Sequence, residues 1–205
     1  MSLSTESNPA AIASRFINHT SRNVFLTGKA GTGKTTFLKH IISYTHKKAV
    51  IVAPTGIAAI NAGGVTIHSL FQLPFGSFIP SSGSLAELYG GQKVNTPASL
   101  LRNQRLAGVK RTLLQQLELL IIDEVSMLRA DLLDAIDTVL RSIRRKNTPF
   151  GGVQLLFIGD LMQLPPVVKE DERPVLERYY NSLFFFEAHA LKDNPPLYIE
   201  LDKIY

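Results

Sequence analysis

The chain has 205 residues, a hydrophobic content of 45% and a formal net charge of +5, so it can bury the core of one α/β domain and permits a polyanionic partner. It contains no cysteine, which excludes a disulfide framework, a thiolate metal site and a cysteine nucleophile. No apolar run approaches a membrane span, and the polar N-terminus, MSLSTESNPA, shows no targeting signal. We therefore expect a cytoplasmic protein, bacterial in type, without a membrane partner.

Residues 1–22 are predicted to form an N-terminal extension that contains one short helix. The helix is expected from Pro9 to His19, because it has one apolar face, made of Ala10, Ile12, Ala13, Phe16 and Ile17. The main domain is predicted to span residues 23–205, since the strong strand and loop signals begin at Asn23.

The strongest signal is the stretch NVFLTGKAGTGKTTFL at residues 23–38. A buried strand is followed by G-x-x-x-x-G-K-T and a helix, which is the arrangement of a phosphate-binding loop. Its glycines let backbone N–H groups turn inward, and the helix N-terminus attracts anions. Lys34 can then hold the outer phosphates, and the Thr35 hydroxyl can hold Mg²⁺. The predicted nucleotide-binding residues are Gly28, Ala30, Gly31, Thr32, Gly33, Lys34, Thr35 and Thr36.

A second candidate site follows the buried strand that AVIVA predicts at Ala49 to Ala53. Thr55 and Gly56 follow this strand and could bind an anion with a hydroxyl and bare amides, because doubly wound sheets bind ligands at the carboxyl ends of strands. His68 and Ser69 could add donors to a phosphate backbone. The alternatives are ordinary turn chemistry for residues 54–56 and a locally bonded core histidine for His68.

The segment from Gln72 to Pro97 is rich in Gly, Pro and Ser and is predicted to be an irregular surface excursion. Phe71, Phe75 and Phe78 could stack nucleobases, although phenylalanines in a loop more often anchor it to the core. A single helix is expected from Ala98 to Gln116, with its four basic residues forming a solvated face.

ELLIIDE, at residues 118–124, predicts a buried strand that ends in two carboxylates. Asp123 could reach a magnesium ion opposite the phosphate loop, and Glu124 could deprotonate a water. The alternative is a pair of acidic residues that merely cap a strand.

The clearest amphipathic helix is predicted from Ala130 to Lys146, with early aspartates and late arginines that oppose the helix dipole. A buried strand at Val153 to Ile158 follows. Gln163, beyond its carboxyl end, could hydrogen-bond a terminal phosphate or a water. A last strand is expected from Leu197 to Leu201.

Four ordered segments, GKAGTGKT, APTGIAAINAGGVTIHSLF, LLIIDEVSM and LLFIGDLMQLPPV, resemble motifs I, Ia with Ib, II and III of superfamily 1 DNA helicases of the RecD/PIF group. The segment from Leu132 to Gly152 resembles the insertion typical of the PIF subgroup. The resemblance covers residues 23–205 and implies the first RecA-like motor lobe of a helicase, a P-loop NTPase three-layer α/β domain with a mostly parallel central sheet. The family uses ATP and Mg²⁺, moves 5′ to 3′ on single-stranded DNA, and acts in DNA repair, recombination and telomere maintenance.

The resemblance also assigns roles to residues. It implies that Lys34 contacts the β- and γ-phosphates, that Thr35 and Asp123 hold Mg²⁺, that Glu124 is the catalytic base and that Gln163 senses the γ-phosphate. The positions that would line the DNA strand are Thr55, Gly56, His68 and Ser69. Residues 10–18 contain no glutamine that matches the family's adenine-reading motif, so adenine specificity stays open.

The family continues beyond ELDKIY into an arginine-bearing motif and a second motor lobe, which we expect in the same polypeptide beyond Tyr205. We accordingly expect a monomer that, as this chain alone, binds nucleotide weakly, hydrolyses it slowly and unwinds nothing. Two other functions remain open from the residues, namely a nucleotide-dependent nucleic-acid-binding module without efficient hydrolysis and a small-molecule kinase with the same loop.

Overall fold

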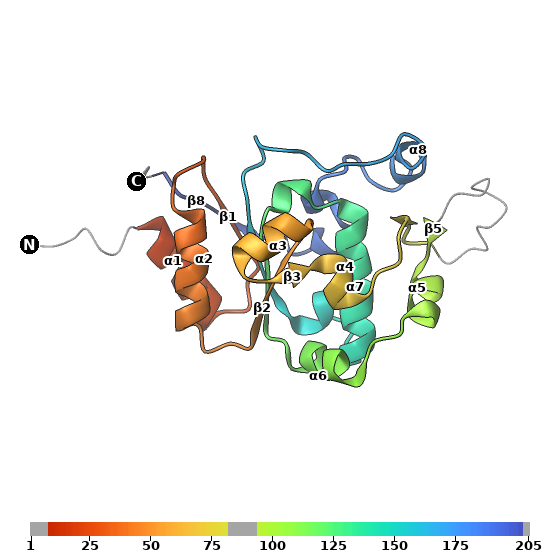
Figure 1. Cartoon of the computed structure of the whole chain (residues 1–205), viewed down its shortest axis with the longest axis horizontal. Coiled ribbons are helices and arrows are strands. Elements are labelled where there is room, and N and C mark those ends of the chain that lie inside the picture. Colours follow the sequence, from red (N-terminus) through yellow and green to blue (C-terminus); the bar gives the residue numbers. More distant parts are fainter. Residues whose placement is uncertain (1–7, 82–93, 203–205) are drawn as a thin grey trace, which may run out of the picture.

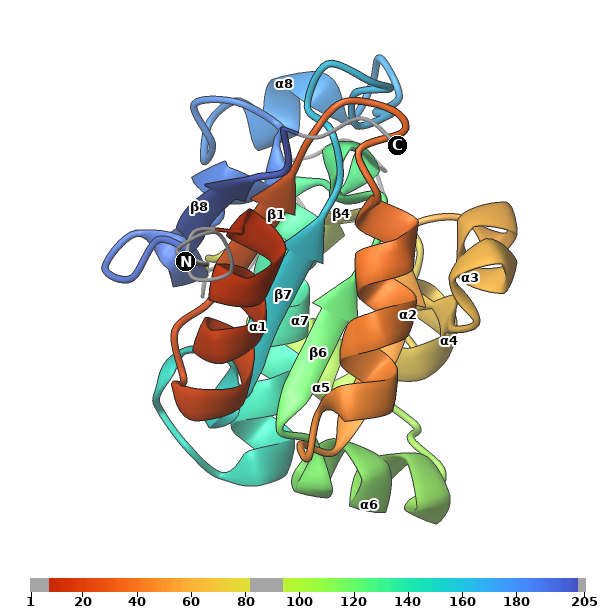
Figure 2. The ribbon, with the colours of Figure 1, turned by 90° about the vertical axis from the view of Figure 1, so that its left-hand side faces the viewer.

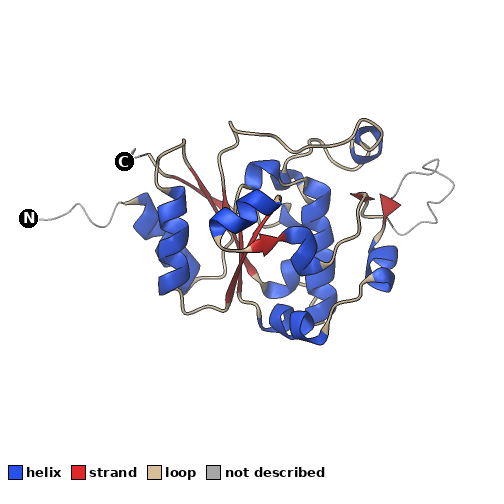
Figure 3. Cartoon of the chain, viewed as in Figure 1, coloured by secondary structure: helices blue, strands red, loops and turns tan. Residues whose placement is uncertain are grey.

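A six-stranded parallel sheet forms the centre of the computed structural model, which describes residues 8–81 and 94–202. The order of strands across the sheet is β3-β2-β6-β7-β1-β8. Figure 3 shows the strands in red between helices on either side. Their bounds are β1 Val24–Thr27, β2 Ala49–Ala53, β3 Val65–Thr66, β6 Leu119–Ile122, β7 Gln154–Ile158 and β8 Leu197–Glu200. A separate short parallel pair is formed by β4 Ser77–Phe78 and β5 Val94–Asn95.

The helices alternate with the strands along the chain, which is the pattern of a parallel sheet with helical crossovers (Figure 1). The α-helices are α1 Pro9–His19, α2 Lys34–Tyr44, α3 Gly56–Ala62, α4 Ile67–Phe71, α5 Pro97–Asn103, α6 Gly108–Gln116, α7 Ala130–Arg144 and α8 Arg173–Leu176. The short 3-10 helices are η1 Val125–Met127, η2 Pro149–Gly152, η3 Phe185–Glu187 and η4 His189–Leu191. None of the helices in these described ranges is long and apolar enough to cross a membrane.

Side chains of the strands alternate between two hydrophobic cores, one on each face of the sheet. On β6, Leu119 and Ile121 pack in the core that includes Ile17 of α1, whereas Leu120 and Ile122 pack in the core that includes Leu140 of α7. Figure 2 shows α1 and α2 over the near face of the sheet and α7 behind it. The predicted three-layer α/β architecture is confirmed, and so are the four strands expected from continuous apolar runs.

The single helix predicted from Ala98 to Gln116 is wrong, because the structure has two helices there. α5 ends at Asn103, and the backbone is extended at Gln104 and again at Ala107 before α6 begins. The Gln104 side chain donates to the Phe71 carbonyl at 3.2 Å, and Leu106 packs against the core. These tertiary contacts interrupt a segment whose apolar periodicity alone favours one helix.

The irregular segment predicted from Gln72 to Pro97 contains β4 and β5, and its residues 82–93 lie outside the described ranges. Phe71 and Phe78 are 0% and 4% exposed and anchor the segment to the core, as the commoner alternative predicts. Phe75 differs from both, since it is 81% exposed.

Helix α7 carries three buried aspartates, Asp131, Asp134 and Asp137, and each accepts a backbone N–H of a neighbouring loop. Asp131 accepts from Phe78, Asp137 accepts from Phe150, and Asp134 accepts from both His189 and Ala190. The interpretation of these aspartates as partners of the helix dipole misses this role. The sequence shows that the residues are acidic and lie early in the helix, but not which loops pack against them. These carboxylates fix three loops to one helix.

We expect Asp134→Asn to lower the free energy of unfolding by about 1–3 kcal/mol, the usual cost of leaving a buried donor unpaired. Both Asp134 carboxylate oxygens accept hydrogen bonds, at 2.9 Å from the Tyr180 hydroxyl, 3.0 Å from the His189 N–H and 2.9 Å from the Ala190 N–H. An amide keeps only one acceptor oxygen. Urea denaturation measures the change, with the exposed Asp193→Asn as the matched control. Equal stability of the two variants would contradict the role of Asp134.

Candidate nucleotide site and strand-binding surface

The loop between β1 and α2 depends on glycines at positions where a side chain has no room or the backbone is left-handed. Gly28 has a φ of +152°, and a Cβ there would lie 2.5 Å from Thr32 Oγ1 and 2.7 Å from the Leu201 carbonyl oxygen. Gly31 and Gly33 have φ values of +83° and +91°, which L side chains rarely adopt. The chain can therefore wrap tightly and start α2 with free N–H groups at its N-terminus.

Lys34, the first residue of α2, points back across this loop. Its ammonium donates to the Gly28 carbonyl and, at 3.0 Å, to the Lys29 carbonyl. The cation therefore lies over the concave side of the loop, where it can exchange these carbonyls for phosphate oxygens.

Two carboxylates face the loop from the carboxyl end of β6. Burial raises the pKa of Asp123. Burial and the nearby Asp123 charge together raise the pKa of Glu124. The Lys34 charge acts in the opposite direction on the pKa of each carboxyl group but does not cancel the rise. Glu124 has a φ of +52° and a ψ of 44°, an uncommon backbone conformation for a residue with a side chain. A Cβ on Gly159 would lie 2.9 Å from the Val125 nitrogen, so a glycine at the end of β7 leaves room for this turn.

Gln163 lies in a turn that follows β7. Its amide group donates to Asp160 Oδ2 at 3.2 Å, and its backbone N–H donates to the Asp160 carbonyl at 3.0 Å. The side chain is thus held by one polar neighbour while the residue remains exposed.

A cleft of about 950 Å³ brings most of the predicted nucleotide residues together. The residues of the prediction that line it are Ala30, Gly31, Thr32, Gly33, Lys34, Thr35, Thr36, Glu124 and Gln163. Gly28 and Asp123 are not part of the lining, but Gly28 bonds to Lys34, and the Lys34 charge acts on Asp123. The sequence thus predicts residues that the fold brings together around one cleft.

The opposite wall of this cleft was not predicted. It includes Asn8, Pro9, Ala10 and Ser14 at the start of α1, together with Leu201 and Asp202 beyond β8. Besides the position of the family's adenine-reading motif, which the resemblance gives, the sequence signal was the helix start, where the Asn8 side chain accepts from the Ala10 N–H at 3.0 Å and Pro9 follows. A capping motif marks a helix N-terminus but does not tell that the helix borders a cleft.

The four residues predicted to contact a DNA strand lie on α3 and α4 or at their starts. Thr55 Oγ1 caps α3 by accepting from the Ala58 N–H at 3.2 Å, and a Cβ on Gly56 would meet no atom within 4 Å. Ser69 is exposed, and its carbonyl accepts from Lys110 at 2.7 Å. Burial, then the Arg129 charge, lower the pKa of His68. Of the four, Thr55 and His68 line one further cavity of about 420 Å³.

A sequence profile described as PIF1-like helicase matches residues 4–184 of this chain. The ATP-dependent DNA helicase PIF1 of Saccharomyces cerevisiae is 38% identical over 188 residues, which cover 89% of this chain and 19% of that protein. The human ATP-dependent DNA helicase PIF1 is 35% identical over 186 residues, or 90% of this chain and 25% of that protein. The chain thus spans about a fifth to a quarter of these relatives.

A solved structure gives the same comparison in three dimensions. Pif1 helicase from Bacteroides, in complex with ADP-AlF3 and ssDNA, superposes with a TM-score of 0.83 and 44% identity, covering 100% of this chain and 43% of that one. The likeness extends over the whole sheet and its helices, so the RecA-like fold expected from the sequence is confirmed.

We expect Lys34→Ala to weaken ADP binding by about 10- to 150-fold, because a hydrogen bond to a charged group is worth roughly 1.5–3 kcal/mol. Isothermal titration calorimetry measures the affinity. The matched control is Lys29→Ala, an exposed lysine of the same loop that does not line the cleft. Equal losses in both variants would indicate nonspecific charge attraction and contradict the assignment of Lys34.

Proposed function

This chain belongs to the PIF1-like helicase family, and from that premise we propose that it is the first motor lobe of an ATP-driven helicase that moves 5′ to 3′ on single-stranded DNA. The observation that carries the proposal is the cleft in which Lys34, Glu124 and Gln163 converge on one phosphate loop. The relatives named as ATP-dependent DNA helicases, and the Bacteroides structure with ADP-AlF3 and ssDNA, support it.

The residues of the loop bind and orient the triphosphate. The N–H groups at the start of α2 and the Lys34 ammonium favour negative charge between them. The Thr35 hydroxyl and the Asp123 carboxylate are hard oxygen ligands of the kind that Mg²⁺ prefers, and we propose that they hold it. The ion would neutralise charge that develops on the β- and γ-phosphate oxygens.

Glu124 is the proposed base. Its carboxylate lines the cleft beside Gln163, so it can accept a proton from a water that attacks the γ-phosphorus in line with the leaving ADP oxygen. Gln163, an uncharged donor and acceptor, can position that water or contact the γ-phosphate. Because Glu124 and Gln163 suit water as the phosphoryl acceptor, they favour hydrolysis over phosphoryl transfer to a small molecule.

The proposed lobe needs positive charge from outside this cleft. Among its described lining residues Lys34 is the only lysine, and none is an arginine. Arginine fingers are worth roughly 10³–10⁵ in rate for phosphoryl transfer. We propose that a second motor lobe, for which the greater length of the relatives leaves room, supplies such an arginine and the other half of the DNA groove, and that this chain alone hydrolyses ATP slowly as a monomer.

We expect Glu124→Gln to keep nucleotide binding and to slow hydrolysis by about 10²–10⁴-fold, the usual contribution of a general base. Glutamine preserves the shape of the side chain but cannot take the proton. Single-turnover phosphate release, with protein in excess over ATP, measures the rate, and calorimetry measures binding. Glu170→Gln, an exposed carboxylate elsewhere, is the control. Loss of binding together with hydrolysis would mean structural damage and would refute the role as base.

We expect binding to single-stranded DNA to tolerate changes of sequence and to weaken as salt rises, because Thr55, Gly56, His68 and Ser69 are proposed to contact the phosphate backbone. Fluorescence anisotropy with mixed-sequence oligonucleotides at several salt concentrations measures this. Ser69→Ala should reduce affinity, whereas Ser142→Ala, on the exposed side of α7, should not. A flat salt dependence or a strong preference for one sequence would contradict backbone binding.

A further inference from the structure

Phe75 is a large apolar side chain that the fold holds in solvent. It is 81% exposed, although its neighbours Leu73 and Phe78 are only 7% and 4% exposed. Exposed phenylalanines are unremarkable when they stand alone. Phe75 does not stand alone, because it lines the cavity of about 420 Å³ that also contains Thr55 and His68.

The ring of Phe75 is stacked on the imidazole of His68, with centroids 5.7 Å apart and planes inclined by 23°. One face of the phenyl ring is therefore covered by a second flat ring, and its high exposure leaves the other face open. The lowered pKa of His68 favours the neutral imidazole. The open face of the Phe75 ring in this neutral stacked pair is suited to a further aromatic ring.

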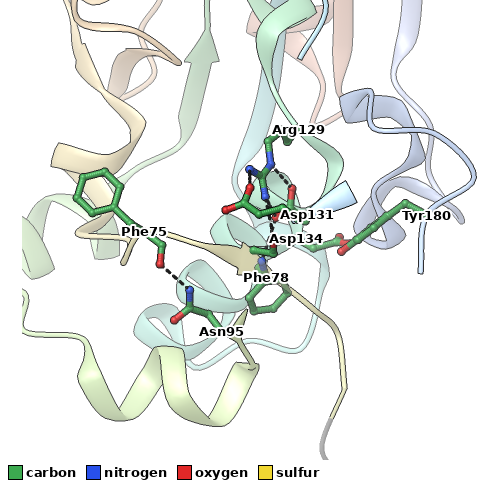
Figure 4. Close-up of polar contacts among 9 residues, drawn as sticks. Phe75, Phe78, Asn95, Arg129, Asp131, Asp134 and Tyr180 are labelled. Atoms are coloured by element: carbon green, nitrogen blue, oxygen red, sulfur yellow. Dashed lines mark hydrogen bonds and ion pairs between the residues drawn. The ribbon is translucent and has the colours of Figure 1, made fainter. Parts of the chain in front are cut away.

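The backbone that carries Phe75 is fixed in place. Its carbonyl accepts from Asn95 Nδ2 at 3.2 Å, and three residues later the Phe78 N–H donates to Asp131 at 2.9 Å (Figure 4). Figure 4 shows the Phe75 ring pointing away from Asn95, while Arg129 and Asp131 lie beyond Phe78. The ring is thus presented by a braced turn, which lowers the entropy cost of a ligand that stacks on it.

The rest of the cavity selects for a flat, mostly apolar ligand. Pro54, Leu73 and Leu100 are among its many apolar lining residues. Arg129, a partly buried cation of the lining, is already paired, at 2.7 Å with Asp131 and at 2.8 Å with Glu172. Arg129 is therefore engaged by two carboxylates and is less available to a phosphate than Lys169, an exposed lysine that also lines the cavity.

We infer that Phe75, stacked on His68, is the platform for one nucleobase of the single strand whose phosphates contact Thr55 and Ser69. This inference rests on the proposed function, and it adds a base-stacking residue to a site otherwise expected to touch only the backbone. Stacking on an aromatic ring tolerates all four bases, so it is consistent with sequence-tolerant binding. Phe75 is the one member of the three phenylalanines at 71, 75 and 78 that is free of the core.

Photocrosslinking tests the position of the base. A thymidine-rich oligonucleotide that carries 5-iododeoxyuridine is bound to the intact 205-residue chain and irradiated, and the crosslinked residue is mapped by mass spectrometry. We expect the crosslink at Phe75, its loss in Phe75→Leu and its retention in Phe75→Trp. The matched control is Tyr44→Leu, since Tyr44 is another exposed ring, 74% exposed and packed beside His40 with centroids 4.4 Å apart and planes inclined by 30°.

Affinity measurements separate stacking from backbone binding. Phe75→Leu should weaken binding of the normal oligonucleotide by about 5- to 150-fold, the range found when a stacking ring is removed. It should leave unchanged the weaker binding of an oligonucleotide of the same length made entirely of abasic sites. Thermal denaturation and ADP binding of the variant should match those of the unmodified chain.

Three outcomes would overturn the inference. If the chain binds the normal and abasic oligonucleotides equally and Phe75→Leu has no effect, the platform is wrong but the proposed function stands. If Phe75→Leu weakens both oligonucleotides alike, the ring supports the fold of the site and does not stack on a base. If the unmodified chain binds neither oligonucleotide, the proposed DNA-binding function fails, and the inference fails with it.

Discussion

The parallel pairing of β6 with β2 on one side and β7 on the other is the constraint on which the rest of the structure depends. Ile122 is level with Val52 and Phe157 in the two registers, and the pairing continues past the strand, where the Asp123 N–H donates to the Val52 carbonyl at 2.9 Å. Because parallel strands all end at one edge, the segments that follow β1, β2, β6 and β7 meet there. A shift of β6 by one residue would turn Ile122 from one core to the other and displace both carboxylates.

Two segments of the chain run from one cavity at this edge to the other. From Glu124 in the nucleotide cleft the chain runs through η1 to Arg129 in the second cavity, and from Gln163 it runs to Val167 and Glu172. The Arg129–Glu172 ion pair, at 2.8 Å, joins the two segments where each reaches the second cavity. The proposed chemistry of ATP and the proposed DNA surface are thus adjacent in the chain as well as in space.

Helix α7 stabilises this arrangement through three buried aspartates. Its aspartates at positions 131, 134 and 137 are 2%, 5% and 8% exposed, and burial raises the pKa of Asp134. A buried carboxylate is costly unless its oxygens are hydrogen-bonded, and here backbone N–H groups of β4, η2 and η4 supply those bonds. The same Asp131 that holds the turn beside Phe75 also pairs with Arg129, so the second cavity relies on this helix.

The sequence by itself determined the central buried strands, the glycine-rich loop after the first of them and the pair of carboxylates after β6, because these depend on local order. Apolar runs of three to five residues predict the buried strands, and the glycines and Lys34 of the loop lie within a few residues of one another in the chain. Tertiary structure alone decided the break between α5 and α6, the burial of the α7 aspartates, the wall of the nucleotide cleft formed by α1, and which of the phenylalanines at 71, 75 and 78 stays exposed. Each of these depends on contacts between residues far apart in the chain, such as Gln104 with Phe71 or Asp134 with Ala190. Periodicity in one segment cannot reveal the partner that another segment brings to it.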